Sequence, residues 1–318
     1  MTINNKEEQE IKKKKKYKIT WREWSLLVFL IPTVIYVFLL HYLPMGGLII
    51  AFKDYNSYQG IFNSPWTSMS GFGHFYYFMS LPNFWDIILN TFIISIYSIA
   101  VNTVFPIILA LLINEIRIKW FKKTVQTVSY APYFISVVVL VGMLFSFTDL
   151  ETGIINSVIE AFGGAPSNLM ENAALFTTIY VVSGLWQGLG WWSIIYVGIL
   201  ATVEPELHEA AVMDGASRMK RIWHINLPAI LPVVIIMLII SIGNMLTVGF
   251  EKIYLMQTNG NITTSEVIST YVYRVSLRAL IPQYSYATAI GLFNSLISVV
   301  LLVSANKISA KVNETSLW

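Results

Sequence analysis

Six stretches of this chain run for about 20 residues without an Asp, Glu, Lys or Arg, and a helix needs about that length to cross a bilayer. Inside a bilayer the backbone must pair its own N–H and C=O groups, so these stretches are predicted to be helices. They cover residues 25–43, 87–113, 125–147, 173–203, 229–250 and 285–305. With 12% charged residues, the 318-residue chain also lacks the polar surface of a soluble domain. We therefore predict an all-α integral membrane protein with six spans.

The positions of the basic residues predict the orientation of the spans. With a cytoplasmic N-terminus, the inner segments are 1–24, 114–124, 204–228 and 306–318, and they contain 17 of the 21 Lys and Arg residues. Such an excess of cations marks the cytoplasmic side of a membrane protein. We therefore predict that both termini are cytoplasmic, with a basic tail over 1–24, a six-helix domain over 25–305 and a tail over 306–318.

Several classes of function are disfavoured by what the chain lacks. It has no cysteine, no histidines at metal-ligand spacing and no Gly-Lys dipeptide, so we predict no metal site, no catalytic residues and no P-loop. No span contains an Asp, Glu, Lys or Arg, which ion-coupled transporters usually need at the midplane. The basic residues follow the membrane topology and do not suggest binding to nucleic acid. Any active transport would draw its energy from a partner.

The segment 204–228 is unusually polar for this chain and carries helix start and stop signals. Pro205 suits the first turn of a helix, and Gly215 can adopt the positive φ of a sharp helix end. Ser217 can cap a second short helix that runs through Trp223, and Pro228 is expected to keep that helix apart from the next span. We predict a helix–turn–helix on the cytoplasmic membrane surface. The spacing alone favours an ordinary amphipathic loop.

A resemblance to a known family strengthens the first interpretation. The segment reads EAA, then DGA, then I-LP, and so resembles the EAA loop of permease subunits of binding-protein-dependent ABC importers. "IAFKDYN", "ALLINEIR", "GLWQGLGWWSIIYVGIL", "TYVYR" and "YSYATAIGLFNS" resemble the carbohydrate-importing branch, in particular the oligosaccharide and polysaccharide permeases of Gram-positive bacteria. The similarity covers nearly the whole chain from about Trp24.

The resemblance implies a type I importer permease fold, a plasma-membrane location and a set of partners. These are a second, similar permease subunit, two ATP-binding subunits that hold ATP and Mg, and an extracellular solute-binding lipoprotein. The chain itself would need no cofactor and would perform no ATP hydrolysis. The loop would be the coupling helix that docks on an ATP-binding subunit, through Glu209, Ala210, Ala211, Asp214, Gly215 and Ala216.

A sugar site needs aromatic platforms and short polar side chains, because sugars present apolar faces edged with hydroxyl groups. The candidates for the substrate path are Tyr133, Gln187, Trp191, Asn244, Thr247 and Glu251. Asn244 and Glu251 would share a helix face if the fifth span continued through both. Two alternatives stay open: a permease for a non-sugar solute, and a membrane-embedded enzyme or sensor that works without an ATPase partner.

Overall fold

The computed structural model describes residues 21–313 and 316–317, so most of the predicted N-terminal tail lies outside the described residues. The described residues form helices joined by short connections, with one isolated bridge between Lys53 and Trp66. The chain divides into two compact parts, one up to Ile49 and one from Ile50 onward.

The first part is a helical rod. Helix α2 (Trp21–Val37) continues through a π-helical turn, η1 (Phe38–Tyr42), into α3 (Leu43–Met45), and a 3₁₀-helix, η2 (Gly46–Phe52), follows at the junction with the second part. The apolar run Leu27–Phe52 is long enough to cross a membrane. This span therefore starts close to the predicted position and ends later than residue 43.

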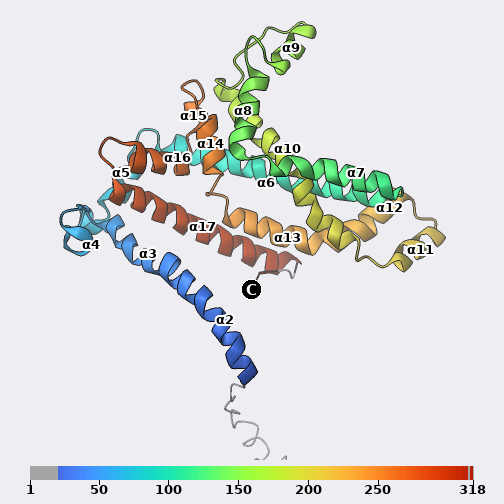
Figure 1. The fold of residues 1–318 in the computed structure, drawn as a ribbon, viewed down its shortest axis with the longest axis horizontal. Coiled ribbons are helices and arrows are strands. Elements are labelled where there is room, and N and C mark those ends of the chain that lie inside the picture. Colours follow the sequence, from blue (N-terminus) through green and yellow to red (C-terminus); the bar gives the residue numbers. More distant parts are fainter. Residues whose placement is uncertain (1–20, 314–315, 318) are drawn as a thin grey trace, which may run out of the picture. The chain divides into compact units, whose positions relative to one another are not determined.

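The second part is built around four long helices: α6 (Phe84–Glu115), α10 (Ala173–Leu200), α13 (Leu227–Gly243) and α17 (Tyr284–Asn313) (Figure 1). Helices α6 and α10 pack along each other, and α13 packs against α17. Three apolar clusters follow α6 from its start to its end, and they bring it against α17, then α8 and α14, then α10 and α13. Between apolar helices in lipid, such close packing and interhelical hydrogen bonds supply the stability.

The third predicted span is two helices and not one. Helices α7 (Lys119–Tyr130) and α8 (Val137–Thr148) meet at 96° across a 3₁₀ turn, η4 (Ala131–Phe134). Pro132 removes a backbone donor there, and the Ser136 hydroxyl restarts the helix by accepting from Val139 N at 3.3 Å. The prediction of one continuous helix over 125–147 is therefore wrong. The described residues hold five helices long and apolar enough to cross a membrane, or six if the bent pair counts as one.

The fifth span also differs from its prediction at both ends. Helix α12 (Arg218–Arg221) passes through a π-helical turn, η5 (Ile222–Asn226), directly into α13. Pro228 lies in the first turn of α13, where its missing N–H is tolerated, so the prediction that it separates the two helices is wrong. At the other end α13 stops at Gly243, and the expected shared helix face of Asn244 and Glu251 does not exist.

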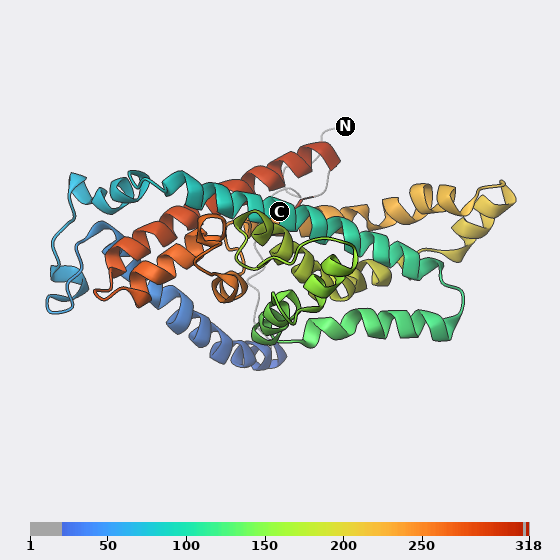
Figure 2. The ribbon, with the colours of Figure 1, turned by 90° about the horizontal axis from the view of Figure 1, so that it is seen from above.

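Short helices gather at the two ends of this second part. The pair α11 (Pro205–Met213) and α12 lies at one end of the long helices, and α5 (Gly73–Met79) and α16 (Ile268–Tyr273) lie at the other (Figures 1 and 2). The remaining short elements are α4 (Gly60–Asn63), η3 (Met69–Gly71), α9 (Ile154–Ala161), α14 (Phe250–Met256), α15 (Ile262–Ser265) and the π-helical turn η6 (Arg274–Arg278).

Candidate functional site

An aromatic stack forms where the third span breaks. The rings of Tyr133, on η4, and Trp191, on α10, lie parallel, with their centroids 4.4 Å apart and their planes within 3°. Phe134 stands edge-on to Trp191, at 6.2 Å and 81°. Each of the two stacked side chains keeps 38% of its surface exposed. The aromatic stack therefore offers rigid, partly open apolar faces within a charge-free region of the chain.

Contacts between α7 and α10 hold the aromatic stack in place. One turn before Trp191 on α10, Gln187 donates its amide N–H to the Ile135 carbonyl at 2.7 Å, which satisfies a backbone group freed by the helix break. Gly190 lets the two helices meet backbone to backbone, since a Cβ there would lie 2.1 Å from the Ser129 carbonyl oxygen. The structure thus brings together three of the predicted path residues: Tyr133, Gln187 and Trp191.

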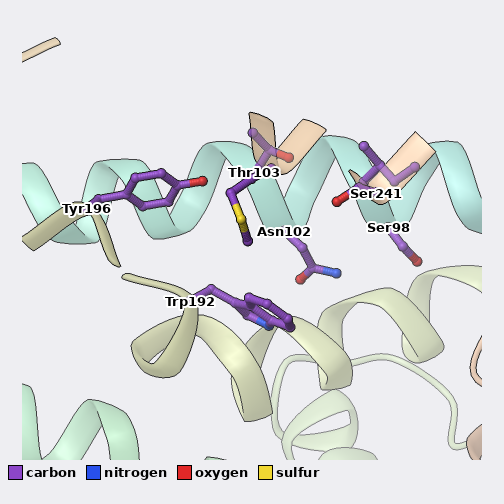
Figure 3. Close-up of a pocket in the computed structure, with 8 residues that line it drawn as sticks. Ser98, Asn102, Thr103, Trp192, Tyr196 and Ser241 are labelled. Carbon is purple, nitrogen blue, oxygen red and sulfur yellow. The ribbon is translucent and has the colours of Figure 1, made fainter. Parts of the chain in front are cut away.

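A cavity of about 180 Å³, whose lining includes several polar side chains, lies among α6, α10 and α13. Figure 3 shows the Asn102 amide of α6 and the Trp192 indole of α10 at the same space. Ser98 Oγ and Asn102 Oδ1 are buried there without a hydrogen-bond partner. Thr103, Tyr196 and Ser241 complete its polar lining. Buried polar groups without partners are costly in a protein interior, so the cavity is suited to water or to a hydroxyl-bearing ligand.

Sequence reasoning did not select the residues of α6 that line this cavity. Ser98, Asn102 and Thr103 are uncharged and lie within the long apolar stretch "SIYSIAVNTVFPI". The four-residue spacing of Ser98 and Asn102 places them on one side of the helix, next to Thr103. This group of polar residues in an apolar span was the signal from which the cavity lining could have been predicted.

Of the other three predicted path residues, Asn244 and Thr247 lie on the connection between α13 and α14, and Glu251 lies in α14. Asn244 and Thr247 bond locally, since the Asn244 amide donates to Ile240 O at 3.1 Å and the Thr247 hydroxyl donates to Asn244 O at 2.8 Å. Glu251 is exposed in the first turn of α14. In the described residues, none of the three side chains makes a hydrogen bond to the aromatic stack. Lys252 beside them is buried, and its ammonium donates to Tyr180 O at 2.9 Å.

The predicted helix–turn–helix at 204–228 is present, and its turn is built on Gly215. Helix α11 ends in a motif in which Ala216 N donates to Ala211 O at 2.8 Å and Gly215 N donates to Val212 O at 3.0 Å. This pairing requires a left-handed residue, and Gly215 has φ +76°. Ser217 then caps α12 by accepting from Lys220 N, as predicted. We call Pro205–Arg221 the α11–α12 hairpin.

The α11–α12 hairpin exposes apolar side chains that have no partner within the described chain. No residue of α11 is buried, and Leu207, Val212 and Met213 are exposed, with 87% of Met213 accessible. Glu209 and Ala210 are exposed as well. A pocket of about 340 Å³ adjoins the turn, lined by Ala211, Ala216 and Arg221, whose Nε is buried without a partner. Exposed apolar side chains that no other part of the described chain covers are typical of a contact site for another protein.

Taken together, charge-free helices, a broken span with an aromatic stack and a protruding helical hairpin define a multi-pass membrane transport subunit. The family model described as "Binding-protein-dependent transport system inner membrane component" matches residues 114–314. The chain belongs to this family, whose members are permease subunits of ABC importers and lack ATPase activity. It is accordingly a multi-pass protein of the plasma membrane, and its membership removes the alternative of a membrane enzyme or sensor.

Relatives match over nearly the whole chain. The "Polygalacturonan/rhamnogalacturonan transport system permease protein YteP" of Bacillus subtilis (strain 168) is 39% identical, over 92% of this chain and 90% of the relative. "Protein LplB" of the same organism is 38% identical, over 93% of this chain and 92% of the relative. A permease chain in the crystal structure of a bacterial alginate ABC transporter, solved with an alginate pentasaccharide-bound periplasmic protein, superposes with a TM-score of 0.85. It is 35% identical, with 93% of this chain and 97% of that chain covered.

Proposed function

We propose that this chain is the permease subunit through which an ABC importer brings oligosaccharides into the cell. The observation that carries the proposal is the aromatic stack of Tyr133, Phe134 and Trp191. Stacked, partly open aromatic rings suit the apolar faces of sugar rings, whereas a site for inorganic anions would need cationic or amide-rich linings. The relatives support the same substrate class, since YteP is named for polygalacturonan and rhamnogalacturonan transport and the alginate transporter imports "the acidic polysaccharide alginate".

The proposed substrate path runs past Tyr133, Gln187 and Trp191. One amide N–H of Gln187 donates to Ile135 O, which leaves its second N–H and its amide oxygen to bond sugar hydroxyl groups. Asn244 and Thr247, on the α13–α14 connection, and Glu251, in the first turn of α14, would form a second part of the path. Because this connection is irregular, its side chains can change orientation during transport more easily than side chains on a continuous helix.

The α11–α12 hairpin is proposed to be the coupling element. Its exposed apolar side chains would fit a cleft of an ATP-binding subunit, with Glu209, Ala210, Ala211, Asp214, Gly215 and Ala216 at the contact. ATP and Mg would bind to two such subunits, and this chain would bind no cofactor itself. A second permease subunit and an extracellular solute-binding lipoprotein would complete the importer. ATP would drive the switch because it binds the two conformations with different affinity.

Uptake by the complete importer tests the proposed substrate class. Proteoliposomes that contain the importer, supplied with its solute-binding protein and internal ATP, should accumulate a labelled oligosaccharide and should hydrolyse ATP faster when the binding protein is loaded. Stimulation and uptake with an amino acid or phosphate, and none with any oligosaccharide, would replace the sugar by a different solute. Vesicles that contain a complex without this chain are the control.

The proposed orientation predicts which positions can be labelled from outside the cell. The chain has no cysteine, so single cysteines can be placed without background. Ser217, Ser167 and Thr263 are all exposed in the structure. A cysteine at Ser217 should resist a membrane-impermeant thiol reagent in intact cells, whereas cysteines at Ser167 and Thr263 should react. After permeabilisation all three should react. The opposite pattern in intact cells would mean that the termini are outside.

A further inference from the structure

Two neighbouring arginines, one helical turn apart on η6, lie at the end of the long helices opposite to the α11–α12 hairpin. Arg274 and Arg278 line two cavities, of about 160 and 340 Å³. The smaller cavity also contains Gln257 and Thr258, and the larger contains Tyr77, Tyr271, Gln283 and Tyr286. Both cavities lie on the connection between the spans that end at Gly243 and begin at Tyr284, and the proposed orientation places this connection outside the cell.

Arg274 is held in a fixed position. One of its guanidinium nitrogens lies 2.8 Å from Glu266 Oε2, and its guanidinium carbon lies 5.2 Å from the ring centre of Tyr271. Burial raises the pKa of Glu266, and the charge of Arg274 opposes that effect. The Tyr271 hydroxyl in turn contacts the Tyr286 hydroxyl at 3.1 Å.

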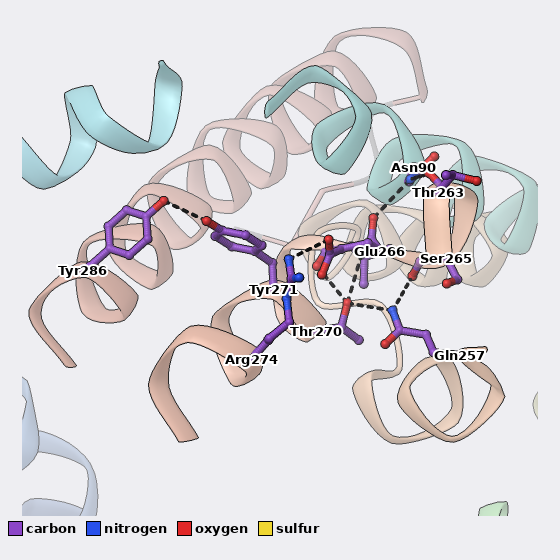
Figure 4. A network of polar contacts seen from close by, with 10 residues as sticks. Asn90, Gln257, Thr263, Ser265, Glu266, Thr270, Tyr271, Arg274 and Tyr286 are labelled. Carbon is purple, nitrogen blue, oxygen red and sulfur yellow. Dashed lines mark hydrogen bonds and ion pairs between the residues drawn. The ribbon is translucent and has the colours of Figure 1, made fainter. Parts of the chain in front are cut away.

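The backbone beneath Glu266 is tied to α6 and α14, as Figure 4 shows. The Asn90 amide donates to the carbonyls of Thr263, at 2.8 Å, and Glu266, at 3.2 Å. The Gln257 amide donates to Ser265 O at 3.0 Å. A site whose walls are held by such a network is organised before a ligand arrives.

Arg278 leaves the cavities with an excess of positive charge. Its guanidinium carbon lies 5.8 Å from the ring centre of Tyr254, and in the described chain no carboxylate pairs with it. Glu266 therefore balances one of the two cations. In the smaller cavity the Thr258 hydroxyl is buried and has no hydrogen-bond partner. The exposed Arg278 guanidinium, with no carboxylate partner in the described chain, is the group left to bind an anionic ligand.

We propose that Arg278 and Arg274 bind a carboxylate-bearing sugar residue of the transported oligosaccharide, at an outer site separate from the aromatic stack. The inference rests on the proposed function and narrows its substrate to acidic oligosaccharides. The guanidinium fork matches a planar carboxylate through two hydrogen bonds. The exposed ring of Tyr77 supplies a face for the sugar ring, and the exposed Gln283 supplies a partner for a hydroxyl group. An inorganic anion such as phosphate has no apolar face and would gain nothing from contact with the Tyr77 ring.

Binding of two matched probes to the complete importer in nanodiscs tests this site. The probes are trigalacturonate and its methyl ester, which has the same rings without the charges. Arg278→Gln should weaken trigalacturonate binding roughly tenfold to a hundredfold and should change binding of the ester less than about twofold. Arg278→Lys, which keeps the charge and loses the fork, should be intermediate. Arg117→Gln, an exposed arginine near the other end of α6, is the matched control.

Four results of these binding and ATPase measurements would overturn the inference. The first is that Arg278→Gln binds trigalacturonate as tightly as the wild type does. The second is that Arg278→Gln loses affinity equally for both probes and has a lower melting temperature, which would indicate a packing role. The third is a rise in the binding-protein concentration needed for half-maximal ATPase, with unchanged probe affinities, which would make the arginines a docking surface. The fourth is an effect that vanishes in nanodiscs without anionic lipid, which would indicate a headgroup site.

The substrate range of the wild-type importer separates this inference from the proposed function. A wild-type importer that imports neutral oligosaccharides alone would refute the inference and leave the proposed function standing. One that imports no oligosaccharide would refute both.

Discussion

Replacing Gly215 with valine should strongly reduce ATP-driven uptake while the spans still insert into the membrane. Gly215 has φ +76°, and a β-branched residue in this left-handed conformation costs about 1–2 kcal/mol. Space is not the obstacle, since nothing lies within 4 Å of a Cβ added there. The strain would instead be relieved by opening the turn between α11 and α12, which would break the bonds from Ala216 N to Ala211 O and from Gly215 N to Val212 O.

The consequence should appear at the proposed contact with the ATP-binding subunit. A change in the angle of the α11–α12 hairpin would misplace Glu209 and Met213, and we expect uptake and substrate-stimulated ATPase to fall at least roughly tenfold, which corresponds to the energy of that strain. Co-purification of the ATP-binding subunits and transport by proteoliposomes are the measurements.

Gly163→Val separates this effect from backbone strain in general. Gly163 also has a positive φ, +82°, and also has nothing within 4 Å of an added Cβ, but it lies in the connection between α9 and α10. The Gly163→Val variant should therefore keep uptake close to that of the wild type. An equal loss in Gly163→Val, or normal assembly and uptake in Gly215→Val, would refute the coupling role of the α11–α12 hairpin.

The features that sequence reasoning predicted well are those decided by local chemistry. A charge-free stretch of bilayer length has no favourable alternative to a helix, so four of the six stretches reappear as long helices, although the fifth ends at Gly243 and the sixth runs on to Asn313. The first reappears as a helical rod that runs beyond residue 43. The turn at Gly215 and the cap at Ser217 were likewise predictable, because a Schellman-type end and a serine cap depend on neighbours within one turn.

The features that sequence reasoning missed depend on contacts between distant segments. Pro132 was visible in the sequence, but a proline in an apolar run can kink a span or break it, and the 96° bend also uses the packing of Ser129 on Gly190. Pro228 shows the opposite case, because a π-helical turn before it allows one continuous helix from Arg218. The cavity at Asn102 and the pairing of Arg274 with Glu266 could not be predicted from the sequence, because each depends on how separate helices pack.

The aromatic stack carries the proposed function, so its removal should have the second large effect. Trp191→Ala would remove the indole that lies 4.4 Å from the Tyr133 ring, and with it one wall of the proposed sugar platform. Loss of a stacked aromatic pair costs about 0.5–1.5 kcal/mol, and the lost apolar contact with a sugar ring adds to this. We expect initial rates of oligosaccharide uptake to fall roughly tenfold, with the loaded binding protein still docking on the complex.

Two further variants distinguish sugar binding from packing. Trp191→Phe keeps a ring against Tyr133 and should restore uptake in part, whereas Trp120→Ala removes an indole that is 74% exposed on α7 and should leave uptake unchanged. In Trp191→Ala basal ATPase should stay near wild type and the melting temperature should fall only slightly, because the side chain is partly open and Gln187 still bonds Ile135 O. A transport rate equal to wild type in Trp191→Ala would remove the aromatic stack from the path. A loss of complex assembly in this variant would instead indicate that Trp191 packs α10 against the broken span, because removal of a sugar contact alone should leave assembly intact.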